Sequence, residues 1–415
     1  MTVKKGERTT REGGTPMNGS TLTTRAGSAR PATWGDTDPV TLGTPHGTAI
    51  AHRAPSPAAA DLDRLNAAVT AALTEFLERQ RTTLAGMDGS LIPLVDEVAA
   101  LAAGGKRLRP SFAYWGWRGA RDTGPGSGED EAAVLRAVSA LEFVHASALV
   151  HDDVMDGATT RRGRPATHIG FASRHAAHAL TGDGELFGTG AAILVGDLAL
   201  VWSDELLRCS GISEGALSRA RAVWDTMRTE VTAGQYLDLL RAAGGLPGPE
   251  GALTVARYKS AGYTVQRPLQ LGVAIAGAGP DVVEATTAIG LPLGEAFQLR
   301  DDVLGVFGDP AVTGKSADDD LREGKQTLLI ALAEEAADSA GRRLLADLLG
   351  NTAARQEDFE ALRALIESTG ARDRVEQRIA ESTARARTAI ADAPLADDAK
   401  AALDALAVAA TTRTS

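Results

Sequence analysis

Cysteine is almost missing from this chain of 415 residues, which contains only one, Cys209. A single thiol cannot form an internal disulfide, so a small fold held together by disulfides, as in many secreted domains, is excluded. We therefore expect an intracellular protein, and specifically a cytoplasmic one.

Aromatic residues and long apolar runs are also scarce. Phe, Trp and Tyr make up 4% of the chain, whereas hydrophobic residues together make up 44%, and these are mostly Ala, Leu and Val. Because Ala and Leu favour helices while aromatic residues favour strands, this composition predicts an all-α fold. We find neither a secretory apolar run near the N-terminus nor a later stretch of about 18 uninterrupted apolar residues, so we expect no membrane span.

Positive charge is in deficit. The sequence has 43 Lys and Arg against 54 Asp and Glu, which gives a formal net charge of −11. Proteins that coat nucleic acids gain most of their affinity from basic contacts with phosphates. We therefore expect no nucleic-acid partner.

The chain divides into a short N-terminal arm and a long helical part. Residues 1–58 are rich in Thr, Gly, Arg, Ala and Pro without any period, which predicts a disordered arm. Apolar residues then recur every three or four positions in residues 61–78, 131–156, 191–207, 217–240, 253–276 and 290–306. The polar, Gly-rich breaks are short: residues 121–130, 181–190 and 242–251. We therefore predict one large helical bundle over residues 59–413.

The first feature that indicates chemistry is an acidic cluster that ends an apolar segment, Leu149 to Asp156. Asp152 and Asp156 are one helical turn apart, roughly 6 Å, so both carboxylates project from the same face. Mg²⁺ usually takes one or two protein carboxylates and completes its shell with water and substrate phosphates. Taken alone, the cluster is also typical of a solvated acidic helix end.

A second acidic pair, Asp301 and Asp302, again follows an apolar helical segment, Leu291 to Leu299. Lys315 and Lys325 come downstream, and taken singly each is typical of a surface lysine. Two acidic segments, each followed by cations, indicate two groups that face each other across a metal-bound diphosphate.

A third feature is the basic run GGKRLRP at residues 104–110. Glycines allow close backbone approach, and paired Lys and Arg suit an anionic ligand, although a helix start with solvated cations is an alternative. His145 lies seven residues before Asp152, almost two helical turns, and so on the same face as the acidic cluster. A lone helix histidine is more often structural.

Together these motifs carry a resemblance to a known family. In chain order they are GGKRLRP (104–110), LVHDDVMD (149–156), RRGRP (161–165), KSAG (259–262), FQLRDD (297–302) and GK (314–315). Over roughly residues 60–410 the sequence resembles the trans-prenyltransferases, or polyprenyl diphosphate synthases, and within them the bacterial geranylgeranyl type. The resemblance implies an all-α fold with a central cavity, a Mg²⁺ cluster and a homodimer. It also implies head-to-tail condensation of isopentenyl diphosphate with dimethylallyl, geranyl or farnesyl diphosphate.

The resemblance further implies roles for individual residues. The metal-binding positions are Asp152, Asp156 and Asp301. The contacts with isopentenyl diphosphate are Lys106, Arg109, His145 and Arg162. The contacts with the allylic diphosphate are Arg161, Lys259, Ser260, Gln298, Lys315 and Lys325. The residues expected to carry catalysis are Asp152, Asp156, Arg161, Lys259, Asp301 and Lys315.

Two positions depart from the family pattern. The second motif ends in Gly305 where the family has a third acid, although Asp309 follows four residues later. Ser260 stands where threonine is usual, and this keeps the hydroxyl group. We expect the first departure to affect a supporting acid more than the metal site itself.

The implied mechanism needs no nucleophilic side chain. Metals and cations neutralise the leaving diphosphate, the allylic C–O bond breaks, and the double bond of isopentenyl diphosphate attacks the carbocation before a proton is lost. A class I terpene cyclase is one alternative, but it requires an Asn-Asp-x-x-Ser-x-x-x-Glu motif that the sequence does not contain. A catalytically inactive regulatory subunit is the other alternative. Such subunits have lost some of the motif aspartates, whereas both acidic pairs are present in this sequence.

Two small residues precede the first acidic motif and bear on product length. Ala148 lies one turn, roughly 6 Å, before Asp152, and Ser147 is adjacent to it. In the resembling family, bulky aromatics at these positions block growth beyond short products. We therefore expect a C20 or longer product, with Phe112 or Trp115 on a neighbouring helix ending the pocket. Small residues here are also consistent with close packing of two helices.

Overall fold

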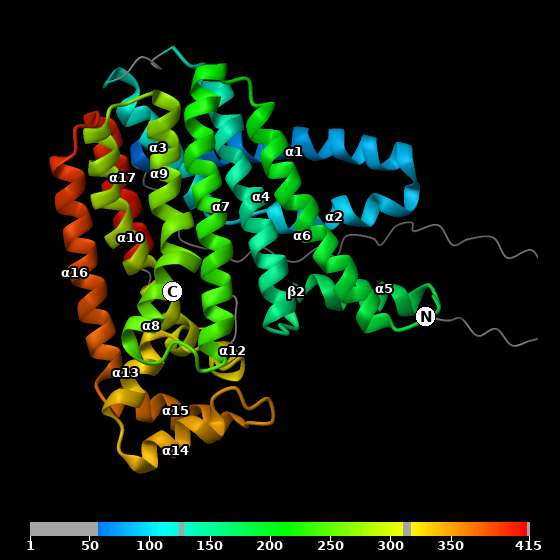
Figure 1. Cartoon of the computed structure of the whole chain (residues 1–415), viewed down its shortest axis with the longest axis vertical. Helices are drawn as coiled ribbons and strands as arrows, with labels where there is room; N and C mark the ends of the chain where they lie inside the picture. Colours follow the sequence, from blue (N-terminus) through cyan, green and yellow to red (C-terminus); the bar gives the residue numbers. More distant parts are fainter. Residues whose placement is uncertain (1–56, 124–127, 310–316, 413–415) are drawn as a thin grey trace, which may run out of the picture. The chain divides into compact units, whose positions relative to one another are not determined.

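A computed structural model describes residues 57–123, 128–309 and 317–412, and these residues are almost entirely helical (Figure 1). The first helices are α1 (Pro57–Met87), α2 (Ile92–Ala102), α3 (Leu108–Ala120), α4 (Glu131–Met155), α5 (Thr167–Ala177), α6 (Gly184–Arg208) and α7 (Glu214–Ala242). The later ones are α8 (Gly248–Val255), η3 (Ala256–Gln266), α9 (Arg267–Ala276), α10 (Pro280–Phe307), α12 (Asp319–Arg322), α13 (Leu328–Ala336), α14 (Ser339–Leu348), α15 (Gln356–Ser368), α16 (Ala371–Asp392) and α17 (Asp397–Thr411). The all-α prediction is confirmed.

Short elements complete the described chain. Single 3₁₀ turns, η1 (Gly89–Leu91) and η2 (Arg121–Thr123), lie between longer helices. Two-residue strands, β1 (Thr160–Arg161) and β2 (Arg164–Pro165), form an antiparallel hairpin directly after α4. The predicted disordered arm lies outside the described residues, except that its last two residues, 57 and 58, begin α1.

Helix α4 is at the centre of the main core. It packs against α1, α3 and α6, and most of its Ala, Val, Leu and Phe side chains are buried. A helix that is apolar on nearly all faces has to be enclosed by others. Asp130 caps its start by accepting a hydrogen bond from the backbone nitrogen of Ala133 at 3.1 Å. The C-terminal end of this enclosed helix carries the first acidic motif.

Several predicted boundaries are wrong. The predicted break at 181–190 contains the first residues of α6, because Asp183 caps that helix by accepting from the nitrogens of Glu185 and Leu186. The second acidic pair does not end its helix, since α10 continues beyond Asp302 to Phe307. This pair therefore projects from the side of a helix.

The segment η3 is a π-helix, a wide helical form that is often found at functional sites. It lies between α7 and α10, and glycines allow both neighbours to approach closely. A Cβ at Gly234 would lie 2.3 Å from the backbone nitrogen of Lys259, and a Cβ at Gly294 would lie 2.6 Å from the carbonyl oxygen of Ala261. These contacts fix the position of Lys259.

Two helices, α4 and α6, are long and apolar enough to cross a membrane when judged by length and composition alone. The apolar window of α4 is 72% buried inside the protein, whereas that of α6 is 39% buried. The burial of α4 identifies it as a core helix. Helix α6 exposes Leu186, Leu194 and Val201. The expected absence of a membrane span therefore stays a prediction.

Candidate active site

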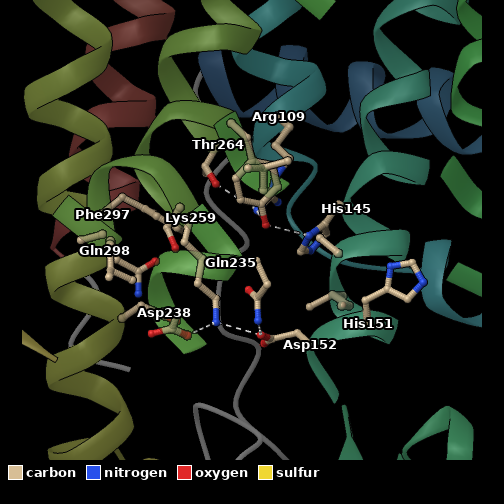
Figure 2. Close-up of a pocket in the computed structure, with 18 of the residues that line it drawn as sticks. Arg109, His145, His151, Asp152, Gln235, Asp238, Lys259, Thr264, Phe297 and Gln298 are labelled. Carbon is tan, nitrogen blue, oxygen red and sulfur yellow. Dashed lines mark hydrogen bonds and ion pairs between the residues drawn. The ribbon is translucent and has the colours of Figure 1, made fainter. Parts of the chain in front are cut away.

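A large cavity of about 690 Å³ lies between α4 and α6 on one side and α7, η3 and α10 on the other (Figure 2). The predicted site residues that line it are Lys106, Arg109, His145, Ser147, Ala148, Asp152, Arg161, Arg162, Lys259, Ser260, Gln298, Asp301 and Lys325. Asp156 is not among the lining residues, and Lys315 lies outside the described residues. The fold thus brings nearly all the predicted positions to one cavity.

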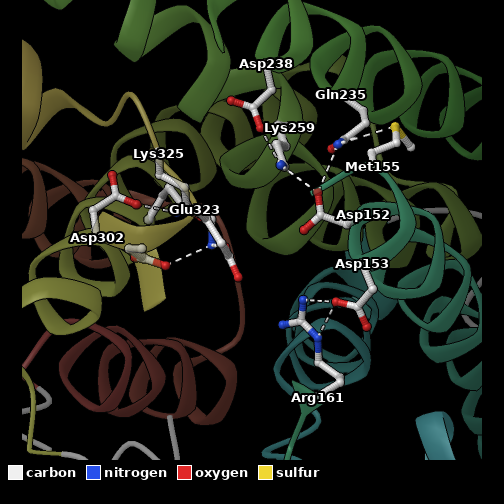
Figure 3. A network of polar contacts seen from close by, with 12 residues as sticks. Asp152, Asp153, Met155, Arg161, Gln235, Asp238, Lys259, Asp302, Glu323 and Lys325 are labelled. Carbon is white, nitrogen blue, oxygen red and sulfur yellow. Dashed lines mark hydrogen bonds and ion pairs between the residues drawn. The ribbon is translucent and has the colours of Figure 1, made fainter. Parts of the chain in front are cut away.

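Asp152 is held by two partners from the opposite side of the cavity (Figure 3). Its Oδ1 accepts hydrogen bonds from Lys259 Nζ at 2.8 Å and from Gln235 Nε2 at 2.9 Å. Burial alone would raise the pKa of Asp152, but the charge of the Lys259 ammonium outweighs it and the pKa is lowered. Asp152 is therefore an ionised carboxylate at neutral pH.

Lys259 lies between two carboxylates. Its Nζ is 2.8 Å from Asp152 Oδ1 and 2.5 Å from Asp238 Oδ2 (Figure 2). Burial works against the charged ammonium, but Asp152 and Asp238 together outweigh it and raise the pKa of Lys259. The side chain is therefore a fixed, fully charged cation.

The sequence reasoning missed Gln235 and Asp238. Gln235 directly follows Gly234 on α7, Asp238 lies three residues later, and both line the cavity. A glycine followed by two polar residues on one face of a long helix was the available signal. It was not specific, because exposed helix faces show the same pattern.

The remaining acids of the first motif have different surroundings. Asp153 is fully buried and forms an ion pair with Arg161, whose Nε donates to its Oδ1 at 2.8 Å. Burial, together with the charge of Asp152, raises the pKa of Asp156 to about 6. The middle acid thus positions an arginine, whereas the outer two repel each other and favour a cation between them.

The second motif is completed from another part of the chain. Asp301 is exposed to the cavity, and Asp302 is buried and accepts a hydrogen bond from Gln298 Nε2 at 2.7 Å. Burial is the main cause that raises the pKa of Asp302 to about 8, and Asp320 adds to it. A Cβ at Gly305 would collide with the Asp320 carboxylate. Asp320 of α12 therefore occupies the space next to the position where the family has its third acid.

Lys325 is placed by the same segment. Its Nζ lies 2.8 Å from Asp320 Oδ1 and 2.9 Å from Glu323 Oε2. These carboxylates outweigh the cost of burial and raise the pKa of Lys325. The predicted cation of the second motif therefore lines the cavity next to Asp320.

Basic residues form another wall of the cavity. Arg109 Nη2 donates to the hydroxyls of Tyr263 at 2.8 Å and Thr264 at 3.0 Å. Arg162 Nη1 donates to the backbone oxygens of Leu101 and Ala103, at 3.0 and 3.1 Å. These acceptors orient the guanidinium groups without neutralising them, which leaves positive charge suited to an anionic ligand.

A buried ion pair fixes the basic run at residues 104–110. Arg107 has a left-handed backbone, with φ 49° and ψ 37°, and its Nη1 lies 2.6 Å from Glu142 Oε2. Both side chains are buried. A non-glycine residue with this backbone persists only where its surroundings hold it. The Glu142 contact thus fixes the turn that presents Lys106 and Arg109.

His145 lies in the basic wall. Its Nδ1 is 3.3 Å from the hydroxyl of Tyr263. Burial and then the charge of Arg109 lower the pKa of His145 well below its usual value. The imidazole is therefore neutral at physiological pH. In this state it can donate or accept a hydrogen bond, but it adds no positive charge to the basic wall.

Another part of the cavity lining is mainly apolar. Ser147 and Ala148 line it together with Val144 on the same helix, Leu200 on α6 and Val231 on α7. Phe112 and Trp115, which the sequence predicts as the end of the pocket, are buried in the core of the described structure and are not among the lining residues. The structure therefore does not support that prediction.

Metal ligation from the protein alone is limited. Within the described ranges, no group of three or more His, Cys, Asp or Glu side chains is close enough to hold a metal ion. The acidic residues instead come from two separate elements, α4 and α10, on opposite sides of the cavity. Such a donor set suits a cation that takes its remaining ligands from substrate phosphates and water.

Comparisons with known proteins agree with this arrangement. A model of the polyprenyl synthetase family matches residues 94–366. Geranylfarnesyl diphosphate synthase of Aeropyrum pernix is 33% identical over 300 residues, which cover 72% of this chain and 86% of the relative. Geranylgeranyl diphosphate synthase of Saccharolobus solfataricus is 31% identical over 260 residues, which cover 62% and 71%.

A solved structure is also similar. The crystal structure of geranylgeranyl pyrophosphate synthase from Corynebacterium glutamicum, complexed with isoprenyl diphosphate and magnesium, aligns with a TM-score of 0.82 and 41% identity. The alignment covers 85% of this chain and 99% of that one. The chain therefore belongs to the polyprenyl synthetase family and is a trans-prenyltransferase, an enzyme that condenses isopentenyl diphosphate head to tail with an allylic diphosphate.

Proposed function

We propose that this enzyme uses Mg²⁺ and makes mainly geranylgeranyl diphosphate, the C20 product. One observation carries the proposal: the same cavity is lined by two acidic groups, by a basic wall and, past Ser147 and Ala148, by the apolar side chains of Val144, Leu200 and Val231. The polar groups suit two diphosphates and a divalent cation, and the apolar part suits a prenyl tail.

The donor set fits a magnesium ion. Asp152 and Asp156 would hold it from α4, and Asp301 from α10, with Asp320 in support. Asp152 is ionised, and the raised pKa of Asp156 reflects a repulsion that a cation would relieve. When bound, the metal supplies positive charge that stabilises the departing diphosphate.

The protein's own cations complete the allylic site. Lys259 is fixed between Asp152 and Asp238 and points into the cavity, where it stabilises the leaving diphosphate. Lys325, Arg161 and Gln298 line the same region. Their contacts hold the diphosphate in one orientation, so that the allylic carbon faces the second substrate.

The basic wall holds isopentenyl diphosphate. Lys106, Arg109 and Arg162 bind its diphosphate, while neutral His145 contributes a hydrogen bond. The diphosphate of this substrate does not leave, so these groups position the attacking double bond. The proton released after attack passes to the departing diphosphate.

Product analysis tests this proposal. The purified chain is incubated with isopentenyl diphosphate, Mg²⁺ and, separately, dimethylallyl, geranyl or farnesyl diphosphate, and the products are identified by mass. We expect C20 prenyl diphosphate from all three primers and no turnover after chelation of the metal. A cyclised hydrocarbon would instead indicate a cyclase. Lack of turnover with every primer would indicate a regulatory subunit.

The active unit is a homodimer in the cytoplasm. Leu186, Leu194 and Val201 are 71%, 57% and 62% exposed on α6, and this apolar face is suited to burial against a second copy. Leu194→Glu with Val201→Glu should therefore yield monomers in analytical ultracentrifugation. Asp197→Glu, a change at a residue already charged on the same helix, is the matched control and should leave the dimer intact.

A further inference from the structure

The apolar end of the cavity is bounded by a charged residue that the mechanism does not use. Arg228 of α7 lines the cavity, and its side chain is 28% exposed. Its guanidinium contacts carboxylates on two helices: Nη1 lies 2.9 Å from Asp204 Oδ1 on α6, and Nη2 lies 2.6 Å from Asp225 Oδ1 on α7. The described structure therefore has an ion pair that joins α6 to α7.

The depth of Arg228 follows from contacts at the polar end. Gln235 of α7 is hydrogen-bonded to Asp152 of α4, so these two residues lie at the same level. Arg228 precedes Gln235 by seven residues, which places it about 10 Å deeper along α7. It lies approximately level with Val144, which is one turn, about 6 Å, deeper than Ala148.

Helix α6 gives the same depth independently. A Cβ at Gly196 would collide with the ring of His151, so Gly196 lies next to the first acidic motif. Asp204 follows Gly196 by eight residues, about 12 Å along the helix. Asp204 and Arg228 thus meet approximately one turn beyond Ala148, at the end of the apolar part of the cavity.

The surroundings hold Arg228 in this position. Asp204 also accepts a hydrogen bond from Trp224 Nε1 at 3.0 Å. Trp224 is buried and lies one turn before Arg228 on α7. The Nε of Arg228 is buried and has no hydrogen-bond partner within the described residues. Buried Trp224 thus holds Asp204, and Asp204 in turn orients the Arg228 guanidinium toward this level of the cavity.

A prenyl tail cannot pass this level without a cost. The side chains of Asp204 and Asp225 are 58% and 66% exposed, so a tail that grew past Arg228 would have to cover this ion pair with hydrocarbon, and that removes charged groups from water. At the levels of Ala148 and Leu200, by contrast, the tail meets small or apolar side chains. An extended isoprene unit is roughly 5 Å long, so the step from Ala148 to Arg228 accommodates about one unit.

We infer that Arg228, held by Asp204, stops chain elongation and sets the product length. The inference rests on the proposed function, because it concerns the tail of the product formed there. Arg228 would act as a specificity-determining residue and would not take part in bond formation.

The experiment compares product lengths in four variants. Arg228→Ala removes the side chain, Arg228→Met keeps its length without the charge, and Arg228→Lys keeps a charge that can pair with Asp204. Arg221→Ala is the matched control, since Arg221 lies two turns earlier on the same face of α7 and does not line the cavity. Each protein receives Mg²⁺ and isopentenyl diphosphate with farnesyl or geranylgeranyl diphosphate as primer.

The expected result is a shift to C25 and longer products in Arg228→Ala and Arg228→Met. The rate with the C20 primer should rise about tenfold, since one added hydrocarbon unit typically changes discrimination by that order. Arg228→Lys and Arg221→Ala should keep the wild-type product. If Arg228→Ala does not fold, the product length of the near-isosteric Arg228→Met variant tests the inference instead.

Two results would overturn the inference. One is an unchanged product from active Arg228→Ala and Arg228→Met, which would mean that the tail runs elsewhere or past the arginine stem. The other is an equal lengthening by Arg221→Ala, which would indicate general loosening of α7. A wild-type protein that elongates no primer would instead refute the proposed function.

Discussion

The two acidic motifs face the same cavity but are built in different ways. The first motif lies at the C-terminal end of α4, where Lys259 pairs with Asp152 and keeps it ionised, and Arg161 pairs with Asp153. The second lacks its third acid, and the Asp320 carboxylate from α12 lies against Gly305 instead. Asp302 of this motif is buried with a pKa of about 8. A similar local set of carboxylates can therefore be assembled from one segment or from two.

The difference shows which acids can be exchanged. Asp152 has two fixed partners across the cavity, so its geometry depends on α7 and η3 as well as on α4. The third position of the second motif depends only on which carboxylate fills the space next to Gly305. We expect the first motif to be intolerant of change and the third position of the second to tolerate an exchange of donors.

The largest effect should come from removing a leading acid. Asp152→Asn or Asp301→Asn should lower turnover by about 10³-fold, because each variant loses a carboxylate that holds the metal ion, and this ion stabilises the leaving diphosphate. Steady-state rates at saturating Mg²⁺ measure this, with circular dichroism to show that the fold survives. Asp281→Asn, at the exposed start of α10, is the control. Retention of more than about a tenth of the rate would contradict the metal assignment.

An exchange of donors within the second motif should have an intermediate effect. Gly305→Asp alone should lower activity about 10²-fold, because its side chain collides with the Asp320 carboxylate. Asp320→Gly alone should also lower activity, since a supporting acid is lost. The double variant should recover activity above either single variant in a double-mutant cycle. Additive losses would show that Asp320 does not take the place of the third acid.

The basic wall should respond differently from the acidic motifs. Lys106→Ala or Arg109→Ala should raise KM for isopentenyl diphosphate about tenfold with little change in kcat, because that diphosphate does not leave. Lys259→Ala should instead lower kcat, because its partner gains charge in the transition state. Initial rates with each substrate varied in turn measure the division. Equal effects of all three changes on both substrates would contradict it.

The smallest effect concerns the pH dependence of stability. The folded protein lowers the pKa of His145, so below about pH 6.5 the unfolded chain binds a proton that the folded protein does not. Wild-type stability is therefore full above that pH and falls, by at most about 1.4 kcal/mol per pH unit, as the pH drops below it. Urea unfolding at pH 7.5 and 5.5 should show a smaller loss in His145→Gln than in wild type. The exposed His178→Gln should behave as wild type, and parallel losses in all three proteins would refute the assignment.

Local sequence predicted the parts of the fold that depend on local preferences. The Ala- and Leu-rich periodicity predicts α4 and α7 closely, since a helix needs little beyond composition and spacing. The start of α6 was missed because Asp183 caps a glycine-containing first turn. The π-helical form of η3 was also missed, since it depends on close contacts with α7 and α10 that no local pattern shows.

The same limit applies to the site. The motif residues were found because each lies in a recognisable run, such as the two aspartates of the first motif. Asp238 and Arg228 have no such run around them and come to the cavity only through tertiary packing. Asp320 does lie in an acidic run, but no local pattern shows that its carboxylate packs against Gly305. Phe112 and Trp115 were predicted at the end of the tail pocket because they are large, but both are buried in the core and neither lines the cavity. Bulk alone does not show which side of a helix faces a cavity.

The most direct test of the account is whether Mg²⁺ binding requires a diphosphate. Isothermal titration of Mg²⁺ into the wild-type protein is compared without and with a non-reactive allylic thiolodiphosphate, and then repeated with Asp152→Asn and Asp301→Asn. Because the acids lie on opposite sides of the cavity and the described residues include no three-ligand cluster, we predict weak binding alone and at least about 10²-fold tighter binding with the analogue. Each variant should lose that gain. Tight binding without the analogue, or a gain that survives both substitutions, would contradict the account.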